Sequence, residues 1–168
     1  MPSFLNPEQQ ALAQEIAALL TDRGQTVAVA EASSGGLISA ALLWVPGASR
    51  YYAGGGVLYT LNSRVVLGGA PAERVANYRG TTPEMIGAIA ASMRQRTGAT
   101  WCVAESGLAG PTGGRAGAPP GHTVIGVVGP VSRIEIVETN LNDREANMVE
   151  FTTRSLRLFL NVLREAKV

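Results

Sequence analysis

The stretch that decides the fold is residues 26–36, TVAVAEASSGG, in which small and apolar residues lead into a turn of two serines and two glycines. Residues 26–30 predict a short buried strand, and Ser33 or Ser34 is suited to be the N-cap of a helix over residues 35–43. A strand that continues directly into a helix is typical of α/β proteins.

Strand and helix patterns alternate on both sides of this stretch. Before it, apolar residues recur at helical spacing over residues 7–23, and Gly24 ends that helix. After it we expect a strand over 54–60, a helix over about 61–67, a helix between Thr82 as its N-cap and Gly98, and a strand over 100–106.

The last third of the chain changes pattern. Residues 122–129 and 132–139 predict an antiparallel hairpin, because the turn between them is too short for a crossover. A final helix is expected from Asp143 to about Glu165. The order of elements predicts a three-layer α/β/α sandwich with a mixed sheet, formed by one domain over residues 1–168.

Composition excludes several classes of function. A net charge of +1 gives no electrostatic footprint for nucleic acid or an anionic membrane. The chain has no apolar run of about 18 residues, and its first residues lack the features of a signal peptide, so we expect a cytoplasmic protein. The only cysteine, Cys102, sits in an apolar run and predicts a buried structural thiol. The only lysine is Lys167, and the only histidine is His122.

Two glycine-rich loops follow predicted strands and suggest a shared pocket at the carboxyl edge of the sheet. The serines and glycines of residues 33–36 have a structural interpretation as caps and turns, while the following helix N-terminus is suited to bind an anion. Residues 107–121 form a long glycine-rich segment, which is usually functional or disordered. Arg115 within it is placed either to clamp a phosphate or to point into solvent.

Three titratable residues stand next to these loops. Glu31 and Glu105 lie at the ends of the two strands, and they form either a carboxylate pair or two exposed loop acids. His122 is either a base or a structural residue at the start of a strand. The segment after Ser106 lacks the Gly-Lys-Ser/Thr ending of a phosphate-binding P-loop, which argues against a nucleoside triphosphatase.

The blocks AEASSGG, GGGVLYTLNSR, SGLAGPTGG, PPGHTV and NDREAN occur in this order over residues 9–160. With them the chain resembles the CinA C-terminal domain family, whose stand-alone members include nicotinamide mononucleotide amidohydrolases. The resemblance implies hydrolysis of a nicotinamide amide by a Ser/Lys mechanism without a metal or other cofactor. It also implies a small-molecule ligand and favours a homo-oligomer, while the net charge argues against a nucleic-acid or membrane partner.

Matching the family's pattern residue by residue reveals two departures. The family's nucleophilic serine directly follows the glutamate, and that position is Ala32. The family's tyrosine falls on Tyr59, but the lysine that acts as base falls on Arg64, and arginine cannot accept a proton at neutral pH. The positions left for ligand binding are Ala32, Gly35, Gly36, Arg64, Ser106, Gly107 and Arg144.

Two hypotheses follow from these departures. The first is a divergent or catalytically impaired member that binds a nucleotide-like or phosphorylated ligand. The second is an active amidohydrolase in which Ser33 or Ser34 has become the nucleophile, assisted by Tyr59, His122 or Glu31. A misplacement of about 1 Å costs about a hundredfold in rate, which counts against the second.

Overall fold

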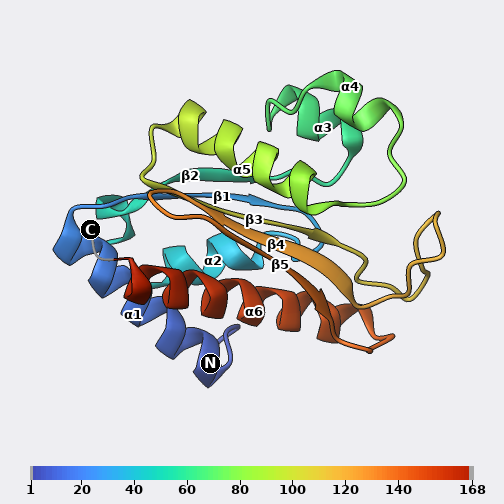
Figure 1. Cartoon of the computed structure of the whole chain (residues 1–168). Helices are drawn as coiled ribbons and strands as arrows, with labels where there is room; N and C mark the ends of the chain where they lie inside the picture. The colour runs from blue at the N-terminus through green and yellow to red at the C-terminus, as the bar shows by residue number, and fades with distance from the viewer. Residues whose placement is uncertain (1, 167–168) are drawn as a thin grey trace.

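A five-stranded sheet in the order β2-β1-β3-β4-β5 forms the centre of the computed structural model, which describes residues 2–166 (Figure 1). Its strands are β1 (Val27–Glu31), β2 (Tyr52–Val57), β3 (Trp101–Gly107), β4 (His122–Val128) and β5 (Arg133–Glu138). β1 pairs in parallel with β2 and β3, whereas β4 pairs antiparallel with β3 and β5. The sheet is therefore mixed, as predicted.

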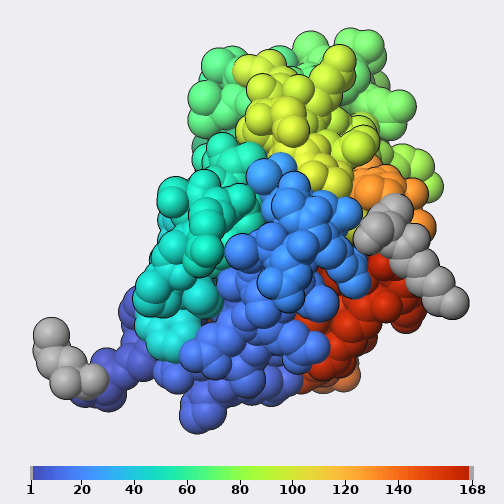
Figure 2. Space-filling model, turned by 90° about the vertical axis from the view of Figure 1, so that its left-hand side faces the viewer, coloured from blue at the N-terminus to red at the C-terminus, as the bar shows by residue number. Residues whose placement is uncertain are grey.

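Helices cover both faces of the sheet. They are α1 (Pro7–Arg23), α2 (Leu37–Trp44), α3 (Leu61–Val66), α4 (Ala72–Ala76), α5 (Pro83–Thr97) and α6 (Arg144–Glu165), with a 3-10 helix at Ala48–Arg50. In Figure 1, α3, α4 and α5 lie above the sheet, and α1, α2 and α6 lie below it. Figure 2, which views the end where β1 begins, shows the same layering from α5 at the top to α1 and α6 at the bottom. The predicted three-layer sandwich is confirmed.

The central strand β3 divides the core by alternation of its side chains. Trp101 and Val103 join the larger cluster beneath the sheet, where Trp101 meets Phe159 of α6 edge to face at 6.1 Å. Cys102 and Ala104 join the smaller cluster under α5. Successive residues of a strand face opposite sides, so one apolar run supplies both cores.

Several details differ from the sequence-based expectation. The prediction that Ser33 or Ser34 caps α2 is wrong, because α2 begins at Leu37 with Gly36 as its N-cap. β2 ends at Val57 rather than extending to residue 60, since Thr60 is already the N-cap of α3. The short helix α4 was not predicted. Within residues 2–166, no helix is both long and apolar enough to cross a bilayer.

Candidate functional site

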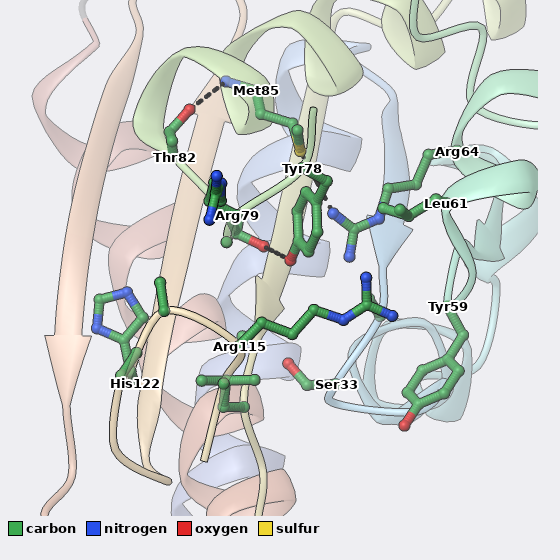
Figure 3. Close-up of a pocket in the computed structure, with 18 of the residues that line it drawn as sticks. Ser33, Tyr59, Leu61, Arg64, Tyr78, Arg79, Thr82, Met85, Arg115 and His122 are labelled. Carbon is green, nitrogen blue, oxygen red and sulfur yellow. Dashed lines mark hydrogen bonds between the residues drawn. The ribbon is translucent and has the colours of Figure 1, made fainter. Parts of the chain in front are cut away.

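A cavity of about 890 Å³ opens at the carboxyl ends of β1 and β3, where the sequence predicts a shared pocket (Figure 3). It lies within the range of about 300–1,000 Å³ that is typical of small-molecule sites. The turn after β1 contributes Ala32 and Ser33, and the glycine-rich loop contributes Gly107 and Arg115. The opposite wall is formed by α3, which contributes Arg64, and by the segment between α3 and α5, which contributes Tyr78.

Arg64 is the most enclosed charged residue of the cavity. Only 5% of its surface is exposed. Its guanidinium donates from Nη2 to Ser106 Oγ at 2.8 Å and from Nη1 to Met85 Sδ at 3.3 Å, and Cζ lies 5.1 Å from the centroid of the Tyr78 ring. All three partners are uncharged. Among the described residues, Arg64 has no carboxylate within ion-pair distance.

A chain of hydroxyl groups fixes the wall beside Arg64. The Tyr78 hydroxyl lies 3.0 Å from Thr81 Oγ1, which in turn lies 2.9 Å from Ser106 Oγ. Because Ser106 also accepts from Arg64, the chain ties the loop after α4 to the end of β3. Figure 3 shows the Tyr78 ring standing beside the guanidinium of Arg64. The result is a fixed cationic group under an aromatic ring.

The lining of the cavity is strongly cationic. Arg74, Arg79 and Arg115 join Arg64, and the lining includes no aspartate or glutamate. None of these four arginines forms an ion pair within the part of the chain that the structure describes. Hydrogen bonds from its own backbone N–H and from the Thr82 side chain, at the start of α5, lower the pKa of the Glu84 carboxyl. The positive charge of Arg74 lowers this pKa further by a smaller amount. In a chain of net charge +1, this concentration of cations gives the cavity a lining that attracts anions.

The turn after β1 is held by two buried carboxylates. Glu31 and Glu105 are neighbours in the paired strands, with exposed fractions of 0% and 1%. The Ser34 hydroxyl lies 2.7 Å from Glu31 Oε2 and 2.8 Å from Glu105 Oε2. The interpretation of these glutamates as exposed loop acids is therefore wrong, and they form the alternative carboxylate pair.

These carboxylates also occupy the helix N-terminus that the sequence suggested as an anion site. Glu31 accepts from the backbone N–H groups of Ile38 at 3.0 Å and Ser39 at 2.9 Å. Glu105 accepts from the Ser34 N–H at 2.9 Å. An external anion would have to displace these internal ones, so the prediction of an anion site at the start of α2 is wrong.

The two candidate serines have different environments. Ser33 lines the cavity, and its hydroxyl donates to Glu105 Oε1. Ser34 is fully buried and is not among the lining residues. Glu105 already accepts from several other groups, including Thr123 Oγ1 at 2.7 Å, so few of its lone pairs are free to take a proton from Ser33.

Tyr59 and Arg144 meet at the rim of the cavity. Tyr59 is 58% exposed. Its hydroxyl accepts from Arg144 Nη2 at 3.1 Å, while Arg144 Nη1 donates to the carbonyl of Gly110 at 2.7 Å. Arg144 does not line the cavity but ties the glycine-rich loop to Tyr59.

The remaining predicted positions are mixed. Gly35 and Gly36 do not line the cavity and adopt positive φ angles of 68° and 101°, as a tight turn requires. Gly107 does line it. His122 also lines it, next to Gly107 across the β3–β4 pair, with Nδ1 2.5 Å from Glu138 Oε1. Lys167 lies outside the described residues.

Sequence reasoning missed the wall formed by Arg74, Tyr78, Arg79, Thr81 and Met85. No motif marks that segment, and only its arginines signal a function. Cys102, by contrast, is buried as predicted, and burial raises the pKa of its thiol to about 12. The described residues contain no cluster of histidine, cysteine or acidic side chains suited to hold a metal.

Fold and cavity together define an α/β/α domain with a ligand-sized cavity at the carboxyl edge of its parallel strands. The family model for the CinA C-terminal domain matches residues 9–163. A CinA-like protein of Prochlorococcus marinus (strain AS9601) is 34% identical over 145 residues, which are 86% of this chain and 34% of that protein. One from Parasynechococcus marenigrum (strain WH8102) is 40% identical over 71% of this chain and 29% of its own length. The chain thus spans about a third of these curated relatives.

Solved structures agree with this relationship. The competence/damage inducible protein CihA from Agrobacterium tumefaciens superposes with a TM-score of 0.90 at 25% identity, covering 98% of this chain and all of that one. A CinA superfamily protein from Klebsiella pneumoniae gives a TM-score of 0.88 at 22% identity, covering 94% of this chain and 99% of its own, and that likeness concerns the fold alone. This chain belongs to the CinA C-terminal domain family.

Proposed function

We propose that this protein binds a nucleotide-like or other phosphorylated small molecule in the cationic cavity and does not hydrolyse it by a Ser/Lys mechanism. The observation that carries the proposal is that Ala32 and Arg64 line the same cavity. The position expected to hold the nucleophilic hydroxyl has a methyl group, and the position expected to hold the base has a guanidinium that stays protonated.

The cavity retains what a phosphorylated ligand needs. Four arginines line it without an acidic neighbour in the lining, and the Tyr78 ring offers an aromatic surface beside them. Arginine suits phosphate because its planar fork donates two parallel hydrogen bonds. Binding groups are present here although the proton-transfer groups are replaced.

Nicotinamide mononucleotide tests both halves of the proposal. It should raise the melting temperature of the purified protein, and the rise should grow with the logarithm of its concentration above the Kd, because a ligand that binds only the folded state stabilises it. Arg115→Gln should weaken that shift, whereas Arg154→Gln, which removes an arginine paired with Glu150 on α6, should leave it unchanged. No ammonia should be released during the incubation.

A second candidate function is amide hydrolysis with Ser33 as nucleophile, and its supporting observation is that Ser33 lines the cavity with its hydroxyl bonded to Glu105. Ammonia release that disappears in Ser33→Ala and persists in Arg154→Gln would establish this function and overturn the first. Ser34 is a poorer candidate, because its hydroxyl is fully buried between two carboxylates.

A further inference from the structure

We infer that the ligand carries two anionic groups, a carboxylate held by Arg64 at the inner end of the cavity and a phosphate held by the outer arginines. The protein would then distinguish a carboxylic acid from its carboxamide and bind the acid. This inference rests on the proposed function and adds the chemical class of the ligand. It assigns Arg64 a role in binding the ligand's carboxylate, whereas the proposed function concerns only the absence of a lysine base at position 64.

At the inner end, Arg64 has no carboxylate within ion-pair distance among the described residues. The buried Glu31 and Glu105 line a small space beside it, but their oxygens accept from the turn after β1 and the start of α2. Arg64 has an exposed fraction of only 5%, and its side-chain contacts are Ser106 Oγ, Met85 Sδ and the Tyr78 ring. A buried cation without an acidic partner is unfavourable, so a ligand anion that reaches it gains more than one bound in water. A guanidinium has five N–H donors, and two N–H contacts are assigned here, which leaves donors for a ligand.

The surroundings of Arg64 favour a carboxylate over a phosphate. The neighbouring lining groups are the Ala32 methyl, the Met85 side chain and the Tyr78 ring, none of which carries charge. Of the four arginines in the lining, Arg64 alone is buried. One buried cation matches a monoanion, and a planar carboxylate matches the planar fork. A phosphate dianion in the same place would keep one charge uncompensated in an apolar setting.

The outer end offers the opposite conditions. Arg74, Arg79 and Arg115 are exposed, and no ion pair within residues 2–166 engages them. Several exposed donors with access to water suit a phosphate that carries up to two charges. Figure 3 shows Arg115 entering from the glycine-rich loop and Arg64 from α3, with Ser33 below them.

The acid and amide forms of one ligand test the inference directly. Isothermal titration of the wild-type protein with nicotinic acid mononucleotide, nicotinamide mononucleotide and ribose 5-phosphate should give a Kd for the acid at least about tenfold lower than for the amide, the range of a charge-assisted hydrogen bond. Arg64→Gln should bring the ratio of the two Kd values to about one. Arg115→Gln should raise the Kd of the acid and the Kd of the amide by the same factor, so that the ratio of the two Kd values stays as in the wild-type protein.

The possible results are distinguishable. Equal Kd values for acid and amide in the wild-type protein overturn the inference while the proposed function stands. If no phosphorylated probe binds, both fail. If the Arg64→Gln variant does not fold, the wild-type ratio still decides, because a Kd at least about tenfold lower for the acid supports the inference and equal Kd values overturn it.

Discussion

The guanidinium carbon of Arg64 lies 5.1 Å from the centroid of the Tyr78 ring, which makes a half-buried tyrosine the cover of the most enclosed cation in the cavity. Arg64 belongs to α3, and Tyr78 belongs to the loop after α4, which has no regular secondary structure. The hydroxyl chain from Tyr78 through Thr81 to Ser106 holds this loop in place beside Arg64. It defines how the loop after α4 closes over the site.

Tyr78→Ala should lower the free energy of unfolding by more than Tyr78→Phe does. The alanine variant loses the ring and its interaction with the cation, which is worth about 0.5–2 kcal/mol, together with apolar contacts. The phenylalanine variant keeps the ring and loses one hydrogen bond of about 1 kcal/mol. Urea unfolding monitored by circular dichroism measures both. Equal losses in the two variants would mean that the hydroxyl chain, rather than the ring, holds this loop.

Ser34→Ala should destabilise the protein strongly, by about 3 kcal/mol, because it removes a donor shared by two buried carboxylates. Ser33→Ala removes one contact to Glu105, which keeps Thr123 and the Ser34 groups as donors. Its loss should be smaller, about 1 kcal/mol. Denaturant midpoints of the two variants provide the comparison. A larger loss for Ser33→Ala would contradict the assignment of Ser34 as the link between the glutamates.

Gly107→Ala should destabilise the junction of β3 and β4. A Cβ at this position would lie 2.2 Å from the carbonyl oxygen of His122 and 2.5 Å from Thr123 Cα, so the strand pair must separate. Overpacking of this kind costs about 1–3 kcal/mol or more. Gly80→Ala is the matched control, because a Cβ there meets nothing within 4 Å. A calorimetric melting temperature that falls equally in both variants would contradict this account.

Local signals in the sequence predict those elements whose ends are set locally. Thr82 accepts from the Met85 N–H and Gly98 closes α5 in a left-handed conformation, so the expected helix and the observed one nearly coincide. The same holds for α1, which ends at Gly24. The start of α2 could not be predicted in this way. Its serines are engaged by Glu105 from a neighbouring strand, which is a tertiary contact with no local signal.

The candidate site divides in a similar way. Ala32 and Arg64 were identified by resemblance, and Arg115 by its place in a glycine-rich loop, and all three line the cavity. Tyr78 and Thr81 lie in a segment without periodicity, so their roles emerge only when the loop folds against β3. The expected homo-oligomer and cytoplasmic location stay predictions.

Cys102 should make the stability fall with rising pH in the alkaline range. Burial raises the pKa of its thiol to about 12, from an ordinary value near 9.0. Between these values the folded state binds more protons than the unfolded state, so the free energy of unfolding decreases by up to about 1.4 kcal/mol per pH unit. Burial also raises the pKa values of Tyr51 and Tyr52, which act in the same direction.

Cys102→Ala should therefore flatten the alkaline slope without removing it. Urea unfolding at about pH 8 and about pH 10.5 measures the slope in both proteins. The absolute stability of the variant is expected to be lower at the milder pH, because a buried sulfur is replaced by a smaller group. Identical slopes for variant and wild type would show that the thiol does not titrate differently on unfolding.

Introducing a serine at position 32 and a lysine at position 64 should give the cavity the two groups that the proposed function says it lacks. Ala32 and Arg64 line the same cavity, and Arg64 approaches Ser106 next to the buried glutamate that holds the turn after β1. A lysine at position 64 would reach the same space, and burial favours the neutral amine that can accept a proton from a hydroxyl. Neither group works alone, since a base without a nucleophile has no proton to take.

The double variant Ala32→Ser with Arg64→Lys should thus release ammonia from nicotinamide mononucleotide, while each single variant stays near the wild-type background. A positioned general base contributes about 10²–10⁴ in rate, so the double variant should exceed Ala32→Ser by at least about a hundredfold. Adding Ser33→Ala to the double variant is the control, because activity that survives it comes from the introduced hydroxyl. If the double variant is no faster than Ala32→Ser, the residues at positions 32 and 64 do not decide between binding and hydrolysis, and the proposal would have to turn to other lining residues such as His122 or Tyr59.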